Sequence, residues 1–191
     1  MIPLQTPLSE SAVRSLKVGD EVAITGTLFT GRDAVHKYLH EGGPLPPGVS
    51  LANGILYHCG PVIIKDDRGD WKCVAAGPTT SIREEPYQWQ IIRDFGLRAV
   101  IGKGGMGDKT LAACREHGCV YLHAIGGAAQ VLAERVRRVP AVYMMDKFGA
   151  PEAIWQFDVD QFPAVVTMDA QGRSLHADVL AASREQLLKN L

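Results

Sequence analysis

The 191-residue sequence lacks the features that would place it in several broad classes of protein. No apolar run approaches the roughly 18 residues that a membrane-spanning helix needs. The net charge is −1 and both signs are mixed along the chain, so nothing in the overall charge favours binding to nucleic acid or to an anionic membrane. The opening stretch MIPLQTPLSESAVRSL has no basic segment followed by an apolar core, which argues against a secretory signal and favours the cytoplasm.

Cysteine is scarce, and none of the four cysteines forms a C-x-x-C pair: they are Cys59, Cys73, Cys114 and Cys119. In a reducing compartment we expect these residues to be free thiols, mostly buried. We therefore expect no complete metal or cluster site built from this chain alone.

The arrangement of apolar residues predicts one α/β domain covering residues 1–191. The first 77 residues are mostly β, with strands expected in 18–30 and 55–77 and one helix at 32–40. The second half alternates strands with helices, which indicates βαβ units and a parallel sheet. We thus expect a β-rich front half packed with a parallel βαβ half. The expected helices of the second half cover 86–96, 108–118, 126–139 and 184–191, and its strands 97–102, 119–125, 141–145 and 164–175.

The stretch AVIGKGGMGDKT, residues 99–110, places four glycines and a lysine after an apolar run. Its G-x-G-x-x-G spacing resembles the dinucleotide fingerprint, but no acidic residue follows at the distance that would hold the ribose. A phosphate-binding P-loop is also disfavoured, because Asp108 separates Gly107 from Lys109. Two interpretations remain: a tight strand-to-helix connection, or an anion site in which Lys103 and glycine N–H groups grip a carboxylate.

Two other segments carry clustered polar side chains. GPTTSIREE, residues 77–85, can be a helix cap formed by Ser81 and Glu84, or an exposed loop of residues 79–83 ahead of a helix that starts near Pro86. TGRDAVHKYLH, residues 30–40, can be a salt-bridged surface helix or can present Arg32 on an anion. Two arginines and a lysine would suit a small dicarboxylate, because a guanidinium binds a carboxylate bidentately.

These three segments, in this order, resemble motifs of a known family. TGTLFTGRDAVHK, GPTTSIR and IGKGGMG are similar to the C-terminal domain of class I fumarases and the β subunit of L-tartrate dehydratase, which are iron–sulfur hydro-lyases. YLHAIGGAAQVLA and APEAIWQFDVDQFPAVV are similar to the class I fumarase tail. The resemblance runs from about residue 18 to about residue 173. It implies a swivelling β/β/α domain for the fold.

The resemblance also implies roles for particular residues. Thr79 corresponds to the catalytic hydroxyl and His36 to a motif histidine, which we expect to be catalytic as well. The substrate-binding residues would be Arg32, Arg83, Lys103 and Gly104, and this chain would supply no metal ligand. The sequence departs from the family after the threonines, where Glu84 and Glu85 lie beside the expected anion site and are expected to affect substrate choice.

In the family a partner α subunit holds a [4Fe–4S] cluster whose open iron acts as a Lewis acid. The resemblance therefore implies the β subunit of a heterodimer or α2β2 enzyme, active only with its α subunit. The expected reaction is hydration of fumarate to L-malate. L-tartrate dehydration and methyl-substituted diacids remain as alternatives, and a non-catalytic anion-binding module is the more distant one.

Overall fold

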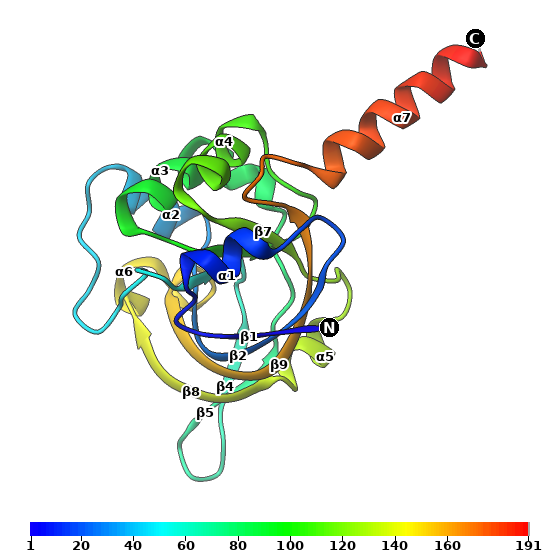
Figure 1. Cartoon of the computed structure of the whole chain (residues 1–191). Helices are drawn as coiled ribbons and strands as arrows, with labels where there is room; N and C mark the ends of the chain where they lie inside the picture. The colour runs from blue at the N-terminus through cyan, green and yellow to red at the C-terminus, as the bar shows by residue number, and fades with distance from the viewer. Residues whose placement is uncertain (191) are drawn as a thin grey trace.

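A computed structural model describes residues 1–190, and its central feature is a seven-stranded sheet in the order β1-β2-β3-β6-β7-β9-β8. Five strands pair in parallel with one another, in the order β1, β2, β3, β6 and β7. The strand β9 runs antiparallel to β7, β8 and β2. Because β9 pairs with both β2 and β7, the sheet closes on itself (Figure 1). The strands are β1 Ile2–Gln5, β2 Glu21–Thr30, β3 Ile55–Tyr57, β4 Val62–Lys65, β5 Trp71–Ala75, β6 Ala99–Gly102, β7 Val120–His123, β8 Val136–Tyr143 and β9 Ile154–Met168.

The helices gather mainly on one side of this sheet, where α2, α3 and α4 lie together (Figure 1). The hairpin β4–β5 is a separate two-stranded sheet that extends from the opposite side. The helices are α1 Glu10–Ser15, α2 Asp33–His40, α3 Glu85–Phe95, α4 Asp108–His117, α5 Ala129–Ala133, α6 Met145–Phe148 and α7 Leu175–Lys189, with 3₁₀ turns η1 Ser81–Glu84 and η2 Ala150–Glu152. No described helix combines the length and the apolar character needed to cross a membrane.

Alternation along the strands divides the interior into two cores. Ile55, Tyr57 and Ile101 point into the closed sheet, where they form the inner core with residues of β2 and β9. Leu56 and Val100 point the other way, into a second core beneath α2, α3 and α4. Because both faces of β3 and β6 are buried, these strands are short continuous apolar runs in the sequence, ILY and AVIG, without an alternation of apolar and polar residues.

The α/β class is confirmed, and most predicted elements are present. α3 has Pro86 in its first turn, and it ends at Gly96, whose φ of 63° allows the left-handed cap. The β-rich half and the βαβ half do not pack as separate layers, however. β3 of the front half pairs directly with β6 of the second half, so one sheet runs through both.

The helix predicted for 126–139 is wrong beyond its first half. Only Ala129–Ala133 is helical, and Val136–Tyr143 forms β8 against β9. Pro140 is incompatible with a helix interior, and it is tolerated here because β8 is an edge strand whose register shifts between Arg138 and Ala141.

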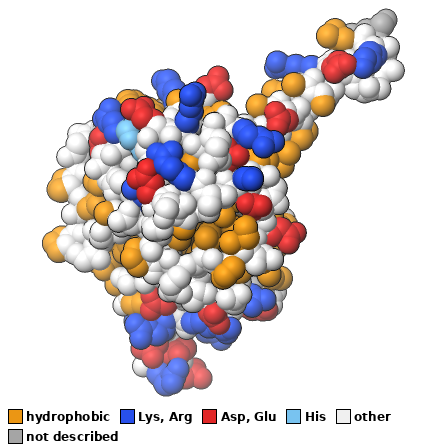
Figure 2. All heavy atoms as spheres, viewed as in Figure 1, with side chains coloured by type: hydrophobic (Ala, Val, Ile, Leu, Met, Phe, Trp, Pro, Cys, Tyr) orange, Lys and Arg blue, Asp and Glu red, His pale blue; other side chains and the backbone are white. Residues whose placement is uncertain are grey.

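Both ends of the chain also differ from the prediction. β9 begins at Ile154, ten residues before the predicted strand at 164, and β1 and α1 were not predicted. α7 begins at Leu175 rather than at residue 184, and the predicted helix's residue 191 lies outside the described residues. α7 projects from the body, with apolar and charged side chains intermixed on its surface, and the tip of the β4–β5 hairpin is densely charged (Figure 2).

Candidate active site

The three polar motifs meet at one edge of the sheet, where parallel strands end. Arg32 follows β2, and Lys103 follows β6. The threonine loop, which we define as residues 78–81, lies between the segments that follow β3 and β6. The Thr79 N–H donates to the His58 carbonyl over 2.7 Å, and the Ser81 N–H donates to the Lys103 carbonyl over 3.0 Å. The carboxyl edge of parallel strands is where ligands bind in open α/β sheets, so this edge is the candidate site.

The guanidinium groups of Arg32 and Arg83 converge on one carboxylate oxygen. Arg32 Nη2 lies 4.0 Å from Oδ2 of Asp33, and Arg83 Nη2 donates a hydrogen bond to the same oxygen. The Arg32 side chain is 23% exposed and that of Arg83 is 53% exposed, so both remain accessible. The structure thus brings together two of the predicted carboxylate-binding residues, and the carboxylate that they share belongs to the protein itself.

A second internal carboxylate, that of Glu152, also serves this region. Its Oε1 lies 3.3 Å from Nε of Arg32, and its Oε2 accepts the Ala34 N–H over 3.0 Å. Glu152 thereby satisfies a backbone donor in the first turn of α2, which has no side-chain cap of its own. Within residues 1–190, the buried Nε of Arg32 has no well-aligned hydrogen-bond acceptor.

The glycines that follow β6 are required by the local geometry. A Cβ on Gly102 would lie 1.8 Å from Oγ of Ser81, so a larger residue cannot occupy this position. Gly104 and Gly105 have φ values of 80° and 81°, a region that favours glycine. These constraints support the interpretation of the loop as a tight strand-to-helix connection. Lys103 is half-buried, and it forms no salt bridge with any acidic residue in the described part of the chain.

The N-terminus of α4 does hold a carboxylate, but the carboxylate is that of Glu85. Its two oxygens accept the N–H groups of Gly107, Lys109 and Thr110 over 2.8, 3.0 and 3.2 Å, and the Thr110 hydroxyl over 2.6 Å. The backbone donors that an external anion would use are therefore already paired. Glu85 fixes α4 instead of lying free beside a substrate, which corrects the expectation from the sequence.

The threonine loop is anchored through its backbone. Thr79 is half-buried and Thr80 is exposed, and among residues 1–190 no hydrogen bond to the Thr79 hydroxyl is present. Neither interpretation of the following residues holds fully. Ser81–Glu84 is a 3₁₀ turn whose ends are buried, so it is not an exposed loop, and its N-cap Thr80 makes no side-chain capping bond.

A network of buried polar side chains, which includes His36, His58 and Gln88, lies beneath these loops. Most of this network was not predicted from the sequence. The Gln88 amide contacts Nε2 of His36 over 2.9 Å and Nε2 of His58 over 2.7 Å. The other ring nitrogen of His58 lies 2.9 Å from Oγ of Ser81, which also accepts the Tyr121 hydroxyl over 2.8 Å. In the sequence, Gln88 is a polar residue three and four positions before Ile91 and Ile92. Its position on the buried face of α3 was therefore the one available signal.

His36 is part of this network and is fully buried. Its Nδ1 lies 2.9 Å from the Arg32 carbonyl oxygen, and its Nε2 contacts Gln88. Burial lowers the pKa of His36 below its usual range, because the charged ring would lose its hydration. With both nitrogens engaged, the ring has no atom left to offer to a substrate in this arrangement.

Glu84 is the other buried ionisable group of the region. Its carboxyl has no exposed surface, and Oε2 lies 3.7 Å from Nδ1 of His36. Burial, and next the negative charge of Asp33, raise the pKa of Glu84 to about 8. Glu84 is therefore a neutral carboxylic acid at neutral pH, whereas the sequence analysis expected it to influence substrate choice as an acidic neighbour.

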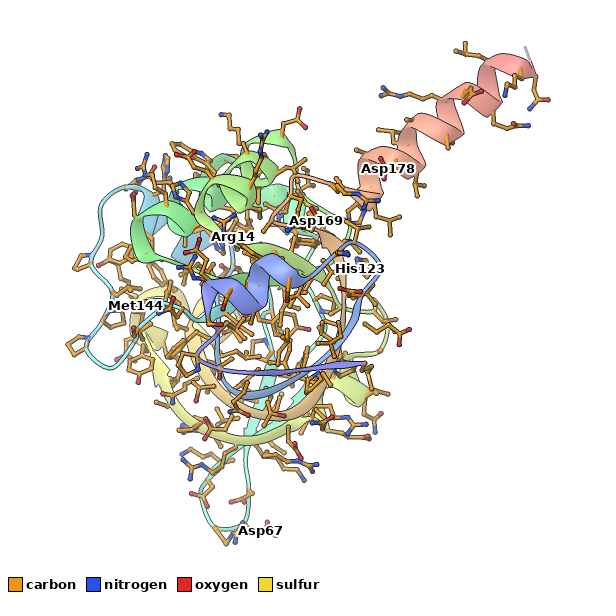
Figure 3. The ribbon with its side chains drawn as sticks, in the orientation of Figure 1. Arg14, Asp67, His123, Met144, Asp169 and Asp178 are labelled. Atoms are coloured by element: carbon orange, nitrogen blue, oxygen red, sulfur yellow. The ribbon has the colours of Figure 1, made fainter. Side chains whose placement is uncertain are left out.

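His123 extends the same edge toward the last helix. It is the final residue of β7, and it lies near the start of α7 (Figure 3), with its ring centroid 6.1 Å from that of His176. Burial lowers the pKa of His123 below its usual range. The motif YLHAIGG contains this residue, but nothing in the sequence indicated that it adjoins the C-terminal segment.

The cysteines of this chain do not fit an iron–sulfur cluster. All four are buried free thiols, and in residues 1–190 no group of three or more His, Cys, Asp or Glu side chains could hold a metal ion. Burial raises the pKa of Cys73 to about 12 and also raises those of Cys59 and Cys119 above their usual range, which opposes the thiolate form that a cluster requires.

The candidate site is open and not enclosed within this chain. A cleft of about 1020 Å³ lies elsewhere, between the β4–β5 hairpin, α5 and β8, and none of the candidate residues lines it. The arginines that share Asp33 lie at the carboxyl edge of the parallel strands, outside this cleft.

Comparison with known proteins places this α/β chain in a family. The chain belongs to the family described as Fumarase C-terminus, whose model matches residues 1–179. Among its relatives, a Geobacillus stearothermophilus protein named "Putative fumarate hydratase class I" is 56% identical over 98% of this chain, which spans only 36% of that relative's length. A Methanocaldococcus jannaschii protein named "Putative L(+)-tartrate dehydratase subunit beta" is 40% identical over 94% of this chain and 93% of its own. The L(+)-tartrate dehydratase subunit beta of Escherichia coli is 33% identical over 98% of this chain and 94% of its own length.

Replacing Glu85 by glutamine is expected to destabilise the protein. A neutral amide loses the charge-assisted bonds at the N-terminus of α4, which costs about 1–3 kcal/mol of unfolding free energy. Urea unfolding of Glu85→Gln measures this loss. Glu116→Gln is the control, because that side chain is 75% exposed near the other end of α4. Equal stability of the two variants would contradict the capping role of Glu85.

Replacing Glu84 by glutamine is expected to change how stability depends on pH. The folded-state pKa of about 8 exceeds the ordinary value of 4.5, so the folded state retains a proton that the unfolded state releases. The stability from this proton is fully present below pH 4.5 and is lost as the pH rises through 8. Urea unfolding midpoints between pH 5 and pH 9 should therefore fall less steeply in Glu84→Gln than in the wild type. Parallel curves would show that Glu84 is ionised throughout.

Proposed function

We propose that this chain is the β-subunit-type half of a hydro-lyase that hydrates fumarate to L-malate. The observation that carries the proposal is the convergence of Arg32 and Arg83 on one carboxylate oxygen. An arrangement that already binds an internal carboxylate has the charge and geometry to bind one end of a dicarboxylate substrate. Membership in the fumarase family supports the reaction class.

In this proposal the cations bind substrate and stabilise charge. One carboxylate of the substrate displaces Asp33 and is held by Arg32 and Arg83. Lys103 and the exposed residue Gly104 face the other end of the substrate. When malate loses the proton next to its carboxylate, negative charge develops on that carboxylate. Fixed cations stabilise this charge more than they stabilise the ground state, which lowers the barrier.

Thr79 is the proposed proton-transfer residue. Its backbone is anchored to His58 and its hydroxyl makes no hydrogen bond in residues 1–190, so the hydroxyl is available to a substrate. A neutral hydroxyl is a weak base, so the proton transfer needs an anionic neighbour supplied at the complete site. His36 is buried and engaged at both nitrogens, and we therefore propose it as a positioning residue in place of the catalytic role expected from the sequence.

A [4Fe–4S] cluster belongs to this proposal only through a partner. Because this chain's thiols do not fit a cluster, we propose that an α subunit holds it, within a heterodimer or α2β2 assembly. The names of the tartrate dehydratase relatives, which designate β subunits, support a partner of this kind. The four free thiols favour a reducing compartment, and we extend the proposal to the cytoplasm.

L-tartrate dehydration is the second candidate. It is favoured by the relatives named tartrate dehydratase subunit beta, which this chain matches over 93% and 94% of their lengths. Fumarate hydration is preferred because identity is higher to the relative named fumarate hydratase, 56% against 40% and 33%. Tartrate also has a second hydroxyl, and an unpaired buried hydroxyl would cost about 1–3 kcal/mol.

The test is paired steady-state kinetics on one complex. The chain is co-produced anaerobically with a candidate α-type chain from the same genome, the cluster is reconstituted, and kcat/KM is measured for L-malate and L-tartrate. We expect malate to be favoured about ten- to a hundredfold, which one unpaired contact can supply. A higher kcat/KM for tartrate would reverse the choice of substrate. No turnover of any 2-hydroxy diacid by a cluster-loaded complex would favour the non-catalytic anion-binding module.

Arg83→Lys is expected to lower kcat/KM more than its retained charge suggests. An ammonium cannot replace the planar fork that binds a carboxylate, and the expected loss of transition-state binding is about 2–4 kcal/mol. The control is Arg93→Lys, because Arg93 is about equally exposed and its salt bridge is with Asp94, its neighbour in the sequence. Equal kinetics for the two variants would remove Arg83 from the site.

Thr79→Ala is expected to lower kcat with little change in KM. This pattern follows if the hydroxyl acts in proton transfer and not in ground-state binding. Thr80→Ala, at the exposed neighbouring position, is the matched control and should have a milder effect. A larger fall in kcat for Thr80→Ala would assign the reacting hydroxyl to Thr80.

A further inference from the structure

We infer that Gln88 is the positioning residue for the three loops of the candidate site, and that its amide NH2 group faces the buried rings of His36 and His58. The inference rests on the proposed function, because the geometry of these loops matters for catalysis only if they bind a substrate. Gln88 itself touches no substrate, since its side chain is fully buried beneath the site.

Within this buried network, each hydrogen-bond donor must face an acceptor. Gln88, His36 and His58 have no exposed surface, and both Nε2 atoms lie next to the amide atom placed as Oε1 of Gln88, at 2.9 and 2.7 Å. A half-turn of the amide keeps its shape and puts the NH2 group at the same position. No bulk water reaches these groups to complete an unmatched pair, and each unmatched buried group costs free energy. The identity of the amide atom therefore follows from the protons on the two rings.

Neutral rings require an amide N–H at this position. The Arg32 carbonyl oxygen accepts only, so Nδ1 of His36, 2.9 Å away, carries that ring's proton. Burial lowers the pKa of both histidines, so His36 has no second proton and its Nε2 is a bare acceptor. If the amide oxygen faced the rings, His36 would have to be an imidazolium. The nearby Glu84 carboxyl, with its raised pKa, supplies no counter-charge for that form.

His58 completes the same pattern. Its Nε2 faces the same amide NH2 group and must accept, so the ring's proton is on Nδ1, which then donates to Oγ of Ser81, an oxygen that has a second lone pair for the Tyr121 hydroxyl. Its Nε2 is then a second bare acceptor. The two N–H bonds of one amide group match two bare ring nitrogens, which explains why a glutamine occupies this position and why both rings are drawn to it.

The network of buried polar side chains reaches the backbone of each candidate loop. His36 is bonded to the Arg32 carbonyl, and the His58 carbonyl accepts the Thr79 N–H. Ser81, held by the His58 ring, donates its N–H to the Lys103 carbonyl. A shift of the Gln88 amide is therefore transmitted to the residues that we propose to bind carboxylate and transfer the proton. Displacement of catalytic groups by about 1 Å can cost on the order of a hundredfold in rate.

The first test uses the unmodified full chain and needs no activity. Ring nitrogen shifts of the protein labelled with ¹⁵N-histidine report the tautomer of each ring, and the two fully buried rings are distinguished by slow exchange with solvent. We expect both to be neutral, with the proton on Nδ1, at pH 7. A proton on Nε2 of either ring, or an imidazolium at His36, would overturn the assigned amide orientation.

The second test compares Gln88→Glu with Gln90→Glu in the reconstituted complex. Gln88→Glu keeps the shape of the side chain but removes both N–H donors. Gln90 lies on the same helix, and its amide donates to the His40 carbonyl over 3.4 Å instead of contacting the two buried histidine rings. We expect Gln88→Glu to lower kcat/KM about ten- to a hundredfold, with both kcat and KM affected, and Gln90→Glu to stay within about twofold of the wild type.

The outcomes separate this inference from the proposed function. Equal kinetics for the two variants, in a complex whose wild type is active, would overturn the positioning role of Gln88. An inactive wild-type complex would count against the proposed function instead, and the nitrogen shifts would still decide the arrangement of Gln88 and the rings. The shifts of the wild type also decide it if Gln88→Glu does not fold.

Discussion

The pairing of β9 with three other strands is the constraint on which the structure depends. β9 hydrogen-bonds β8 and β2 along most of its length and reaches β7 at its end. β2 and β7 are otherwise linked only through β3 and β6, so β9 closes the sheet and shields the inner core. The register of β9 against β2 shifts between Ile24 and Gly26, where φ is 114°, and this bulge lets the strands bend. Closure also fixes the carboxyl ends of β2, β3 and β6 relative to one another.

Internal carboxylates satisfy most of the positive groups near that edge. Asp33 is shared by two arginines, Glu152 serves Arg32 and the first turn of α2, and Glu85 serves α4. Each carboxylate connects elements that are far apart in the sequence. The region is thus held by specific ionic contacts as well as by apolar packing, which suits a site whose cations must keep fixed positions.

Local patterns in the sequence were sufficient to predict much of the fold. Short apolar runs bounded by turn residues identified the strands β3 and β6, and Pro86 and Gly96 marked the ends of α3. The closure by β9 could not be predicted in this way, because Glu21 pairs with Val165 and no local pattern encodes a partner so distant. The first residues of β8, 136–139, were mistaken for a helix because an alanine-rich helical segment shortly precedes them, whereas 141–143 was predicted as a strand.

The candidate site was predictable to a similar degree. The motifs indicated Arg32, Thr79 and Lys103, which follow strands and are brought to one edge by topology alone. The partners of buried polar groups depend on tertiary packing, so the role of Gln88 and the neutral state of Glu84 had no counterpart in the sequence pattern. Glutamate at 85 gave no sign that it would take the amides of α4, twenty-two to twenty-five residues away.

In the site that we propose, Arg32 and Arg83 share Asp33, so a ligand carboxylate would enter by exchange and not by addition. The departing aspartate stays tethered beside the guanidinium groups, and it competes at a fixed local concentration that dilution of the protein cannot reduce. The apparent affinity for a monocarboxylate is lowered by the fraction of time that Asp33 occupies the arginines. A ligand with a second anionic group has another point of attachment, so the internal competitor selects dianions over the many monoanions of a cell.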